Sequence, residues 1–221
     1  MNRIPSITPR ERIWGWAWYG FELLILPGVL VFLGSSLGLS ELQVNFLYYF
    51  LNFAFVCLIF SHFLRENLPG AKGCLGPVLL GYAALEASSF AVGRLIGVFF
   101  PEFANVNDAS LAAMASQGPV MLFVSTVVLV PLAEEVLFRG LIFGELLPRG
   151  RWGAYLVSAL AFCAVHVAGY VGVYPAGLLA LCFLQYLPAG LILALSYEKT
   201  GTLFAPVAIH TAVNLTAMML L

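Results

Sequence analysis

Apolar residues dominate the chain in seven long runs, which short polar or turn-rich breaks separate. An α-helix needs about 20 mostly apolar residues to cross the hydrocarbon core of a bilayer. We therefore expect an all-α polytopic transmembrane bundle of about seven spans. The runs lie at roughly 14–39, 43–64, 75–100, 118–147, 152–171, 173–195 and 202–221.

Lysine and arginine gather on one side of this arrangement. When the loops are assigned alternately to the two sides of the membrane, one side receives Arg3, Arg10, Arg12, Arg65, Lys72, Arg149, Arg151 and Lys199. The other side receives none, and the two remaining basic residues fall inside spans. Because cytoplasmic loops are enriched in Lys and Arg, we expect the N-terminus in the cytoplasm and the C-terminus outside.

The domain organisation expected is one integral membrane domain in two parts. Residues 1–117 hold the first three spans and an external loop, and residues 118–221 hold the last four spans. The loop, residues 101–117, contains acidic residues beside apolar ones. It suits a gate or a segment on the membrane surface, although loops of this length are more often plain connectors.

Composition narrows the class and the partners. Of the 221 residues, 62% are hydrophobic and 10% are charged, and the mean hydropathy is +0.97. Soluble domains are roughly half apolar and a quarter charged, so a soluble or disordered protein is excluded. The net charge of −1 and the scattered basic residues indicate no nucleic-acid partner. The four cysteines form no CxxC pair and are interpreted as packing residues.

Three ionisable residues stand close together in the fourth run. An ionised side chain at the centre of a membrane helix costs about 2.5–3.5 kcal/mol on insertion scales, so each needs a partner or a function. Glu135 and Arg139 are four residues apart on one helix face, where they can pair. Glu134 points about 100° away and has no such partner. It is the candidate general base.

Two histidines also lie within spans. His166 follows Phe162 by four residues, and His210 precedes Asn214 by four. At 1.5 Å per residue, Glu134, His166 and Asn214 all lie about 20 Å from the cytoplasmic ends of their helices, with His210 one turn nearer. One such residue alone is more often an interhelical hydrogen bond. The whole set favours a functional site.

The residue types in this set suit hydrolysis of a carbonyl compound. A glutamate base can activate water, and histidine and amide donors can stabilise the oxyanion. The HExxH motif of helical zinc proteases is absent, and Asp108 is the only aspartate, so an aspartyl pair cannot form. Glutamate chemistry therefore remains, although Glu, His and Arg sets also line small transporters and proton relays.

Three motifs resemble those of a known family. Glu134-Glu135-x-x-x-Arg139, Phe162-x-x-x-His166 and His210-x-x-x-Asn214 are similar in order and spacing to the motifs of the CAAX protease and bacteriocin-processing (Abi) family. This is the family of the type II CAAX prenyl endopeptidase. The similarity covers roughly residues 120–218, whereas the first hundred residues resemble nothing that we can name.

The resemblance implies an intramembrane glutamate endopeptidase of a prokaryotic plasma membrane. By position, Glu134 with His166 would activate water, and His210 with Asn214 would form the oxyanion hole. Glu135 and Arg139 would support the site. The implied partners are the lipid bilayer and a protein or peptide substrate, such as a C-terminal segment or tag. An immunity or scaffold protein without protease activity is the alternative within the family.

The resemblance leaves the cofactor open. Glu134, His166 and His210 can in principle hold Zn²⁺ with a free fourth position. A metal-free reaction, with no cofactor, is favoured.

Overall fold

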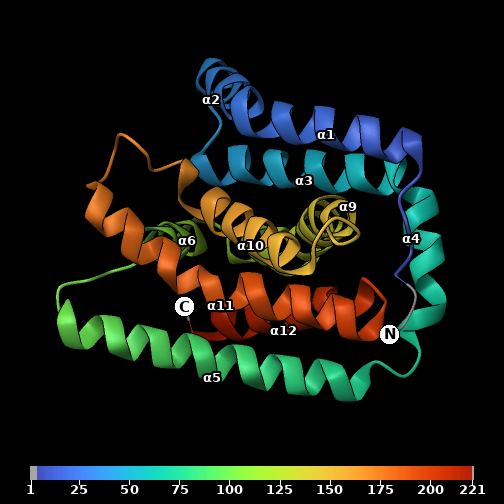
Figure 1. The fold of residues 1–221 in the computed structure, drawn as a ribbon. Coiled ribbons are helices and arrows are strands. Elements are labelled where there is room, and N and C mark those ends of the chain that lie inside the picture. The colour runs from blue at the N-terminus through green and yellow to red at the C-terminus, as the bar shows by residue number, and fades with distance from the viewer. Residues whose placement is uncertain (1–3, 221) are drawn as a thin grey trace.

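The computed structural model describes residues 4–220, which form a bundle of helices (Figure 1). Arg3, which contributes to the charge asymmetry of the loops, lies outside the described residues. The α-helices are α1 (Pro9–Leu24), α2 (Leu26–Leu37), α3 (Glu41–Ile59), α4 (Ser61–Asn67), α5 (Leu75–Phe99), α6 (Val106–Gln117), α7 (Pro119–Phe123), α8 (Val130–Glu135), α9 (Gly144–Leu146), α10 (Arg151–Ala168), α11 (Ala176–Thr200) and α12 (Phe204–Leu220). A 3₁₀-helix, η1 (Leu68–Ala71), and two π-helices, η2 (Val124–Leu129) and η3 (Val136–Phe143), complete the order.

The seven predicted spans appear as helices, but fewer of them qualify as simple spans. Among residues 4–220, five helices are long and apolar enough to cross a membrane: α3, α5, the continuous helix Pro119–Leu146, α10 and α11. A sixth is the pair α1 and α2, which is bent by 51°. The bend lies just before Pro27, whose ring nitrogen cannot donate a helical hydrogen bond. The last span, α12, has 17 described residues and falls short of the required length.

The N-terminal helix is fixed at its start by a buried glutamate. Thr8 and Glu11 form a capping box, in which the backbone N–H of Thr8 donates to Glu11 Oε2 at 2.7 Å. Glu11 Oε1 also accepts from the backbone N–H of Phe63, at the start of α4, at 2.8 Å. The carboxylate therefore ties α1 to the segment that follows α3.

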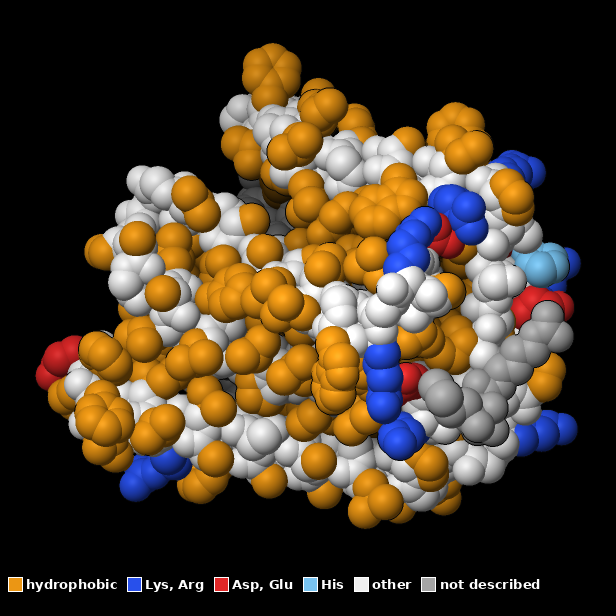
Figure 2. Space-filling model, in the orientation of Figure 1, with side chains coloured by type: hydrophobic (Ala, Val, Ile, Leu, Met, Phe, Trp, Pro, Cys, Tyr) orange, Lys and Arg blue, Asp and Glu red, His pale blue; other side chains and the backbone are white. Residues whose placement is uncertain are grey.

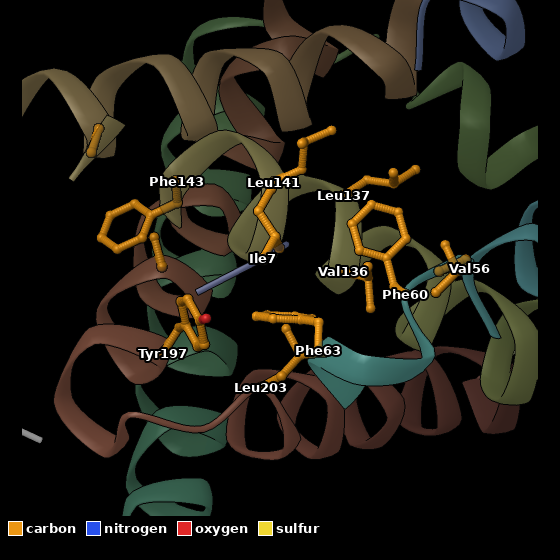
Figure 3. Close-up of a cluster of buried hydrophobic side chains, with 13 residues drawn as sticks. Ile7, Val56, Phe60, Phe63, Val136, Leu137, Leu141, Phe143, Tyr197 and Leu203 are labelled. Atoms are coloured by element: carbon orange, nitrogen blue, oxygen red, sulfur yellow. The ribbon is translucent and has the colours of Figure 1, made fainter. Parts of the chain in front are cut away.

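The helix Pro119–Leu146 occupies the centre of the bundle. Of its most apolar stretch, 61% is buried, compared with 6% for α5. Figure 3 shows part of this core, where Leu137 and Leu141 of η3 lie near Phe60, and Tyr197 lies near Leu203. The close packing of η3 against α4 depends on Gly140, since a Cβ on this residue would lie 2.7 Å from the Phe63 ring of α4.

Many large apolar side chains are exposed on the outer surface. Figure 2 shows them spread over the face in view, with most lysines and arginines at the end where α1 begins. Leu79, Leu80 and Phe90 of α5 are among the most exposed. A helix that presents such residues outward suits contact with lipid rather than water.

Candidate active site

Two stretches of π-helix flank the acidic pair in the central helix. In η2 the backbone N–H of Val130 bonds to the Ser125 carbonyl, five residues earlier. In that register the donor for the Thr126 carbonyl would be residue 131, which is a proline and has no N–H. The side chain of Asn214 on α12 supplies the missing donor, at 2.7 Å. Wide turns of this kind occur frequently at functional sites.

Glu135 is the centre of a fully buried charge cluster. Its Oε2 lies 3.1 Å from Nε of Arg139, which confirms the pairing expected from their four-residue spacing. Its Oε1 lies 2.9 Å from Nδ1 of His210, a contact that the sequence did not predict. Because Nδ1 faces a carboxylate, it carries a hydrogen. Nε2 of His210 then donates a hydrogen bond only when the ring is protonated.

Besides the ion pair with Glu135, Arg139 makes two hydrogen bonds and a cation–π contact. Its Nη2 donates to the carbonyls of Gly190 and Ala189 on α11, at 3.3 and 3.4 Å. Its guanidinium lies 4.6 Å from the centre of the Phe162 ring, a cation–π contact. Phe162 of the second motif therefore acts through packing, a role for which its spacing from His166 gave no signal.

His166 projects from α10 beside the acidic pair. Its Nδ1 lies 2.8 Å from the Phe162 carbonyl, so Nδ1 donates and Nε2 of the neutral ring is an acceptor. The ring stacks on Tyr186 of α11, with centres 4.1 Å apart. His166 and Glu134 lie within electrostatic range of one another. An imidazole fixed in this tautomer is suited to accept a proton.

Glu134 differs from its neighbour in its surroundings. Among the described residues, its buried Oε2 has neither a hydrogen-bond nor an ion-pair partner, whereas Oε2 of Glu135, which also lacks a hydrogen bond, forms an ion pair with Arg139. Buried polar atoms are nearly always hydrogen-bonded to protein or water. The free oxygen therefore marks a place for a water molecule or a substrate donor.

The donor set does not fit a zinc centre in this arrangement. Within residues 4–220, no three His, Cys, Asp or Glu side chains lie together as a group that could hold a metal ion. We therefore derive the chemistry of this site from its side chains alone.

A serine motif lies apart from this cluster. Gly34-Ser35-Ser36-Leu37-Gly38 has the Gly-x-Ser-x-Gly spacing of a nucleophile elbow, which normally joins a strand to a helix. Here it ends α2, and the exposed Ser36 hydroxyl donates to the Phe32 carbonyl at 2.9 Å. The motif is therefore interpreted as a helix end.

The loop expected outside the membrane contains α6, which packs near His166. Asn107 donates to the Tyr186 hydroxyl at 3.0 Å, and Asn105 donates to Gln185 at 2.7 Å. Asp108 is within electrostatic range of His166, and burial raises the pKa of the Asp108 carboxyl above its usual value. The segment is thus folded onto the bundle and is more than a plain connector.

These features define an integral membrane protein with a buried Glu, His and Arg cluster and a partly buried Asn at the centre of an all-helical bundle. Residues 116–216, which include all six predicted site residues, match the family described as type II CAAX prenyl endopeptidase Rce1-like. This part of the chain is therefore similar to that family, whose members are generally peptidases. The resemblance of the three motifs is thereby confirmed.

One relative is also similar to part of the chain. The UPF0177 protein YxdF of Lactococcus lactis is 31% identical over 88 residues, which cover 40% of this chain and 43% of that protein. The match thus spans less than half of the relative's length. No solved structure matches the chain significantly.

Proposed function

We propose that the chain is an intramembrane endopeptidase in which Glu134 activates water without a metal. The observation that carries the proposal is the contrast between two adjacent carboxylates. Glu135 has an ion-pair contact on each oxygen, whereas Glu134, within electrostatic range of His166, has a buried oxygen with neither an ion-pair nor a hydrogen-bond partner among the described residues. Neighbouring acids in different environments commonly divide structural and catalytic roles.

The reaction follows from the hydrogen-bonding capacity of each group. A water molecule between Glu134 and Nε2 of His166 gives its proton to Glu134 as its oxygen attacks the scissile carbonyl. The oxyanion that forms accepts from Nε2–H of protonated His210 and from the second amide hydrogen of Asn214. Glu134 then returns the proton to the leaving amine as the C–N bond breaks.

Glu135 and Arg139 support this chemistry indirectly, by positioning His210. The Glu135 carboxylate accepts from Nδ1–H of His210 and so fixes the ring, whose Nε2 donates to the oxyanion when the ring is protonated. Arg139 fixes the carboxylate on its other side. The substrate class we propose is a membrane-associated protein or peptide, cleaved in a C-terminal segment or tag.

Profiling of protein termini tests the function even while the substrate is unidentified. Membranes of cells that express the wild type, Glu134→Gln or the exposed control Glu66→Gln at equal levels are compared for new N- and C-termini. We expect new termini with the wild type and Glu66→Gln only. If correctly inserted wild type generates none beyond those of Glu134→Gln, the protease function is wrong and an immunity or scaffold role replaces it.

A further inference from the structure

Glu22 is a buried carboxyl group that takes no part in the proposed hydrolysis. It lies near the end of α1, in the part of the chain outside the family match, and only 5% of it is exposed. Trp18 lies beside it, but the indole N–H donates to Asn52 of α3 at 2.7 Å. A carboxyl group kept at such a depth in a membrane helix normally has a task.

The packing of α1 places Glu22 opposite Glu134. A Cβ on Gly15 would lie 3.2 Å from Leu141, and one turn further along α1 the rings of Tyr19 and Phe138 are 6.1 Å apart. The two helices therefore run antiparallel, because increasing residue numbers along α1 lie against decreasing residue numbers along the central helix. Continuing that register by one turn brings Glu22 to Glu134.

Electrostatics agree with the register. Glu134 is the charged group that acts on Glu22, and both carboxyl groups are within electrostatic range of Tyr19 of α1 and Tyr48 of α3. Glu134 alone of the two is also within range of His166 and Arg139. A negative charge is therefore better placed on Glu134 than on Glu22.

We propose that Glu22 and Glu134 share a single proton, which Glu22 holds while Glu134 is ionised. Two facing carboxyl groups in an apolar setting do not readily ionise together, and their titrations are coupled. Through a bridging water, the protonated Glu22 can donate toward the free Oε2 of Glu134. Glu22 is then a positioning residue: it orients the base and prevents a second negative charge beside it. This role rests on the function proposed for Glu134.

Infrared titration of the purified protein in lipid nanodiscs tests the pair without any substrate. In the wild type we expect protonated-carboxyl bands to be lost in two coupled steps. Glu134→Gln should move the ionisation of Glu22 to lower pH, because the neighbouring negative charge is gone. Glu22→Gln should leave Glu134 ionising in one step, near the first step of the pair. Glu66→Gln, which changes an exposed carboxyl group, should preserve both steps. If Glu134→Gln leaves the ionisation of Glu22 at its wild-type pH, the shared proton is disproved.

Cleavage kinetics test the positioning role. Glu22→Gln keeps a neutral donor, so we expect kcat at the optimum to stay within about threefold of the wild type. The alkaline limb of its pH profile should move to higher pH, because the second ionisation of the pair is gone. Glu22→Leu should lower kcat with little change in KM. An unchanged pH profile in Glu22→Gln, or full kcat in Glu22→Leu, would contradict the role.

The two experiments separate the two proposals. Coupled infrared steps in a wild type that cleaves nothing would leave the carboxyl pair intact and reject the protease function. If the wild type cleaves substrate in a way that depends on Glu134 but its carboxyl bands titrate in single, uncoupled steps, the protease function stands and the shared proton is rejected.

Discussion

At the scale of single residues, the site separates two adjacent glutamates by their partners. The pairing of Glu135 with Arg139 follows from helical spacing and could be predicted from the sequence. The contact of Glu135 with His210 could not, because it depends on how two distant helices pack side by side. The cation–π contact of Arg139 with the Phe162 ring could not be predicted either, because it too depends on how two helices pack.

Removing Arg139 should expose the cost of a buried carboxylate. Arg139→Met leaves Glu135 with His210 alone, so we expect a loss of about 3–5 kcal/mol in the free energy of unfolding. Thermal unfolding in a fixed detergent measures it. Because a neutral pair avoids the stranded charge, Glu135→Gln combined with Arg139→Met should recover much of the stability. Strictly additive losses would contradict the buried ion pair.

Asn214 offers a second prediction at this scale. One amide hydrogen is engaged by the Thr126 carbonyl, and the other is assigned to the oxyanion. Asn214→Ala should lower kcat by about 10²–10³, as removal of one oxyanion donor does elsewhere. The measurement is steady-state cleavage, with KM determined alongside. A variant that loses stability but keeps kcat would show that the amide is only a tether.

At the scale of elements, the central helix departs most from a regular α-helix. Apolar run lengths in the sequence predicted where the helices lie, but neither the 51° bend between α1 and α2 nor the π-helical turns. Proline and glycine positions hint at these features without fixing them. Pro131 shows why: its effect depends on the hydrogen-bond register around Thr126, which the sequence does not specify.

The contact of α10 with α11 depends on a glycine. A Cβ on Gly190 would lie 2.9 Å from the backbone Cα of Ala159, and the Gly190 carbonyl accepts from Arg139. Gly190→Ala should therefore force the helices apart and cost about 1–3 kcal/mol. Gly153→Ala, in α10 with open space around it, is the matched control. Equal melting temperatures for the two variants would contradict this packing.

At the scale of the whole molecule, charge sets the expected orientation, and the proposed carboxyl pair joins a residue of the first half to the site in the second. The segregation of Lys and Arg predicts the side of each loop. The family motifs predicted the six candidate residues of the second half, and their roles stay predictions. Glu22 could not be found in this way, since its relation to Glu134 follows only from the packing of α1 on the central helix.

Labelling of intact cells tests the orientation. Cysteines introduced at the exposed positions Glu102 and Arg149 lie in loops assigned to opposite sides. A membrane-impermeant maleimide should label Glu102→Cys in whole cells and Arg149→Cys only after the membrane is opened. The unmodified chain gives the background from its native cysteines. The opposite pattern would invert the predicted topology.

The most direct test of the central claim is the cleavage rate of purified protein in liposomes, measured on a substrate found by terminal profiling. Glu134→Gln should lower kcat by about 10²–10⁴, as loss of a general base does, while insertion and melting temperature stay those of the wild type. Wild-type turnover by Glu134→Gln would contradict the account, because the base would then be another group.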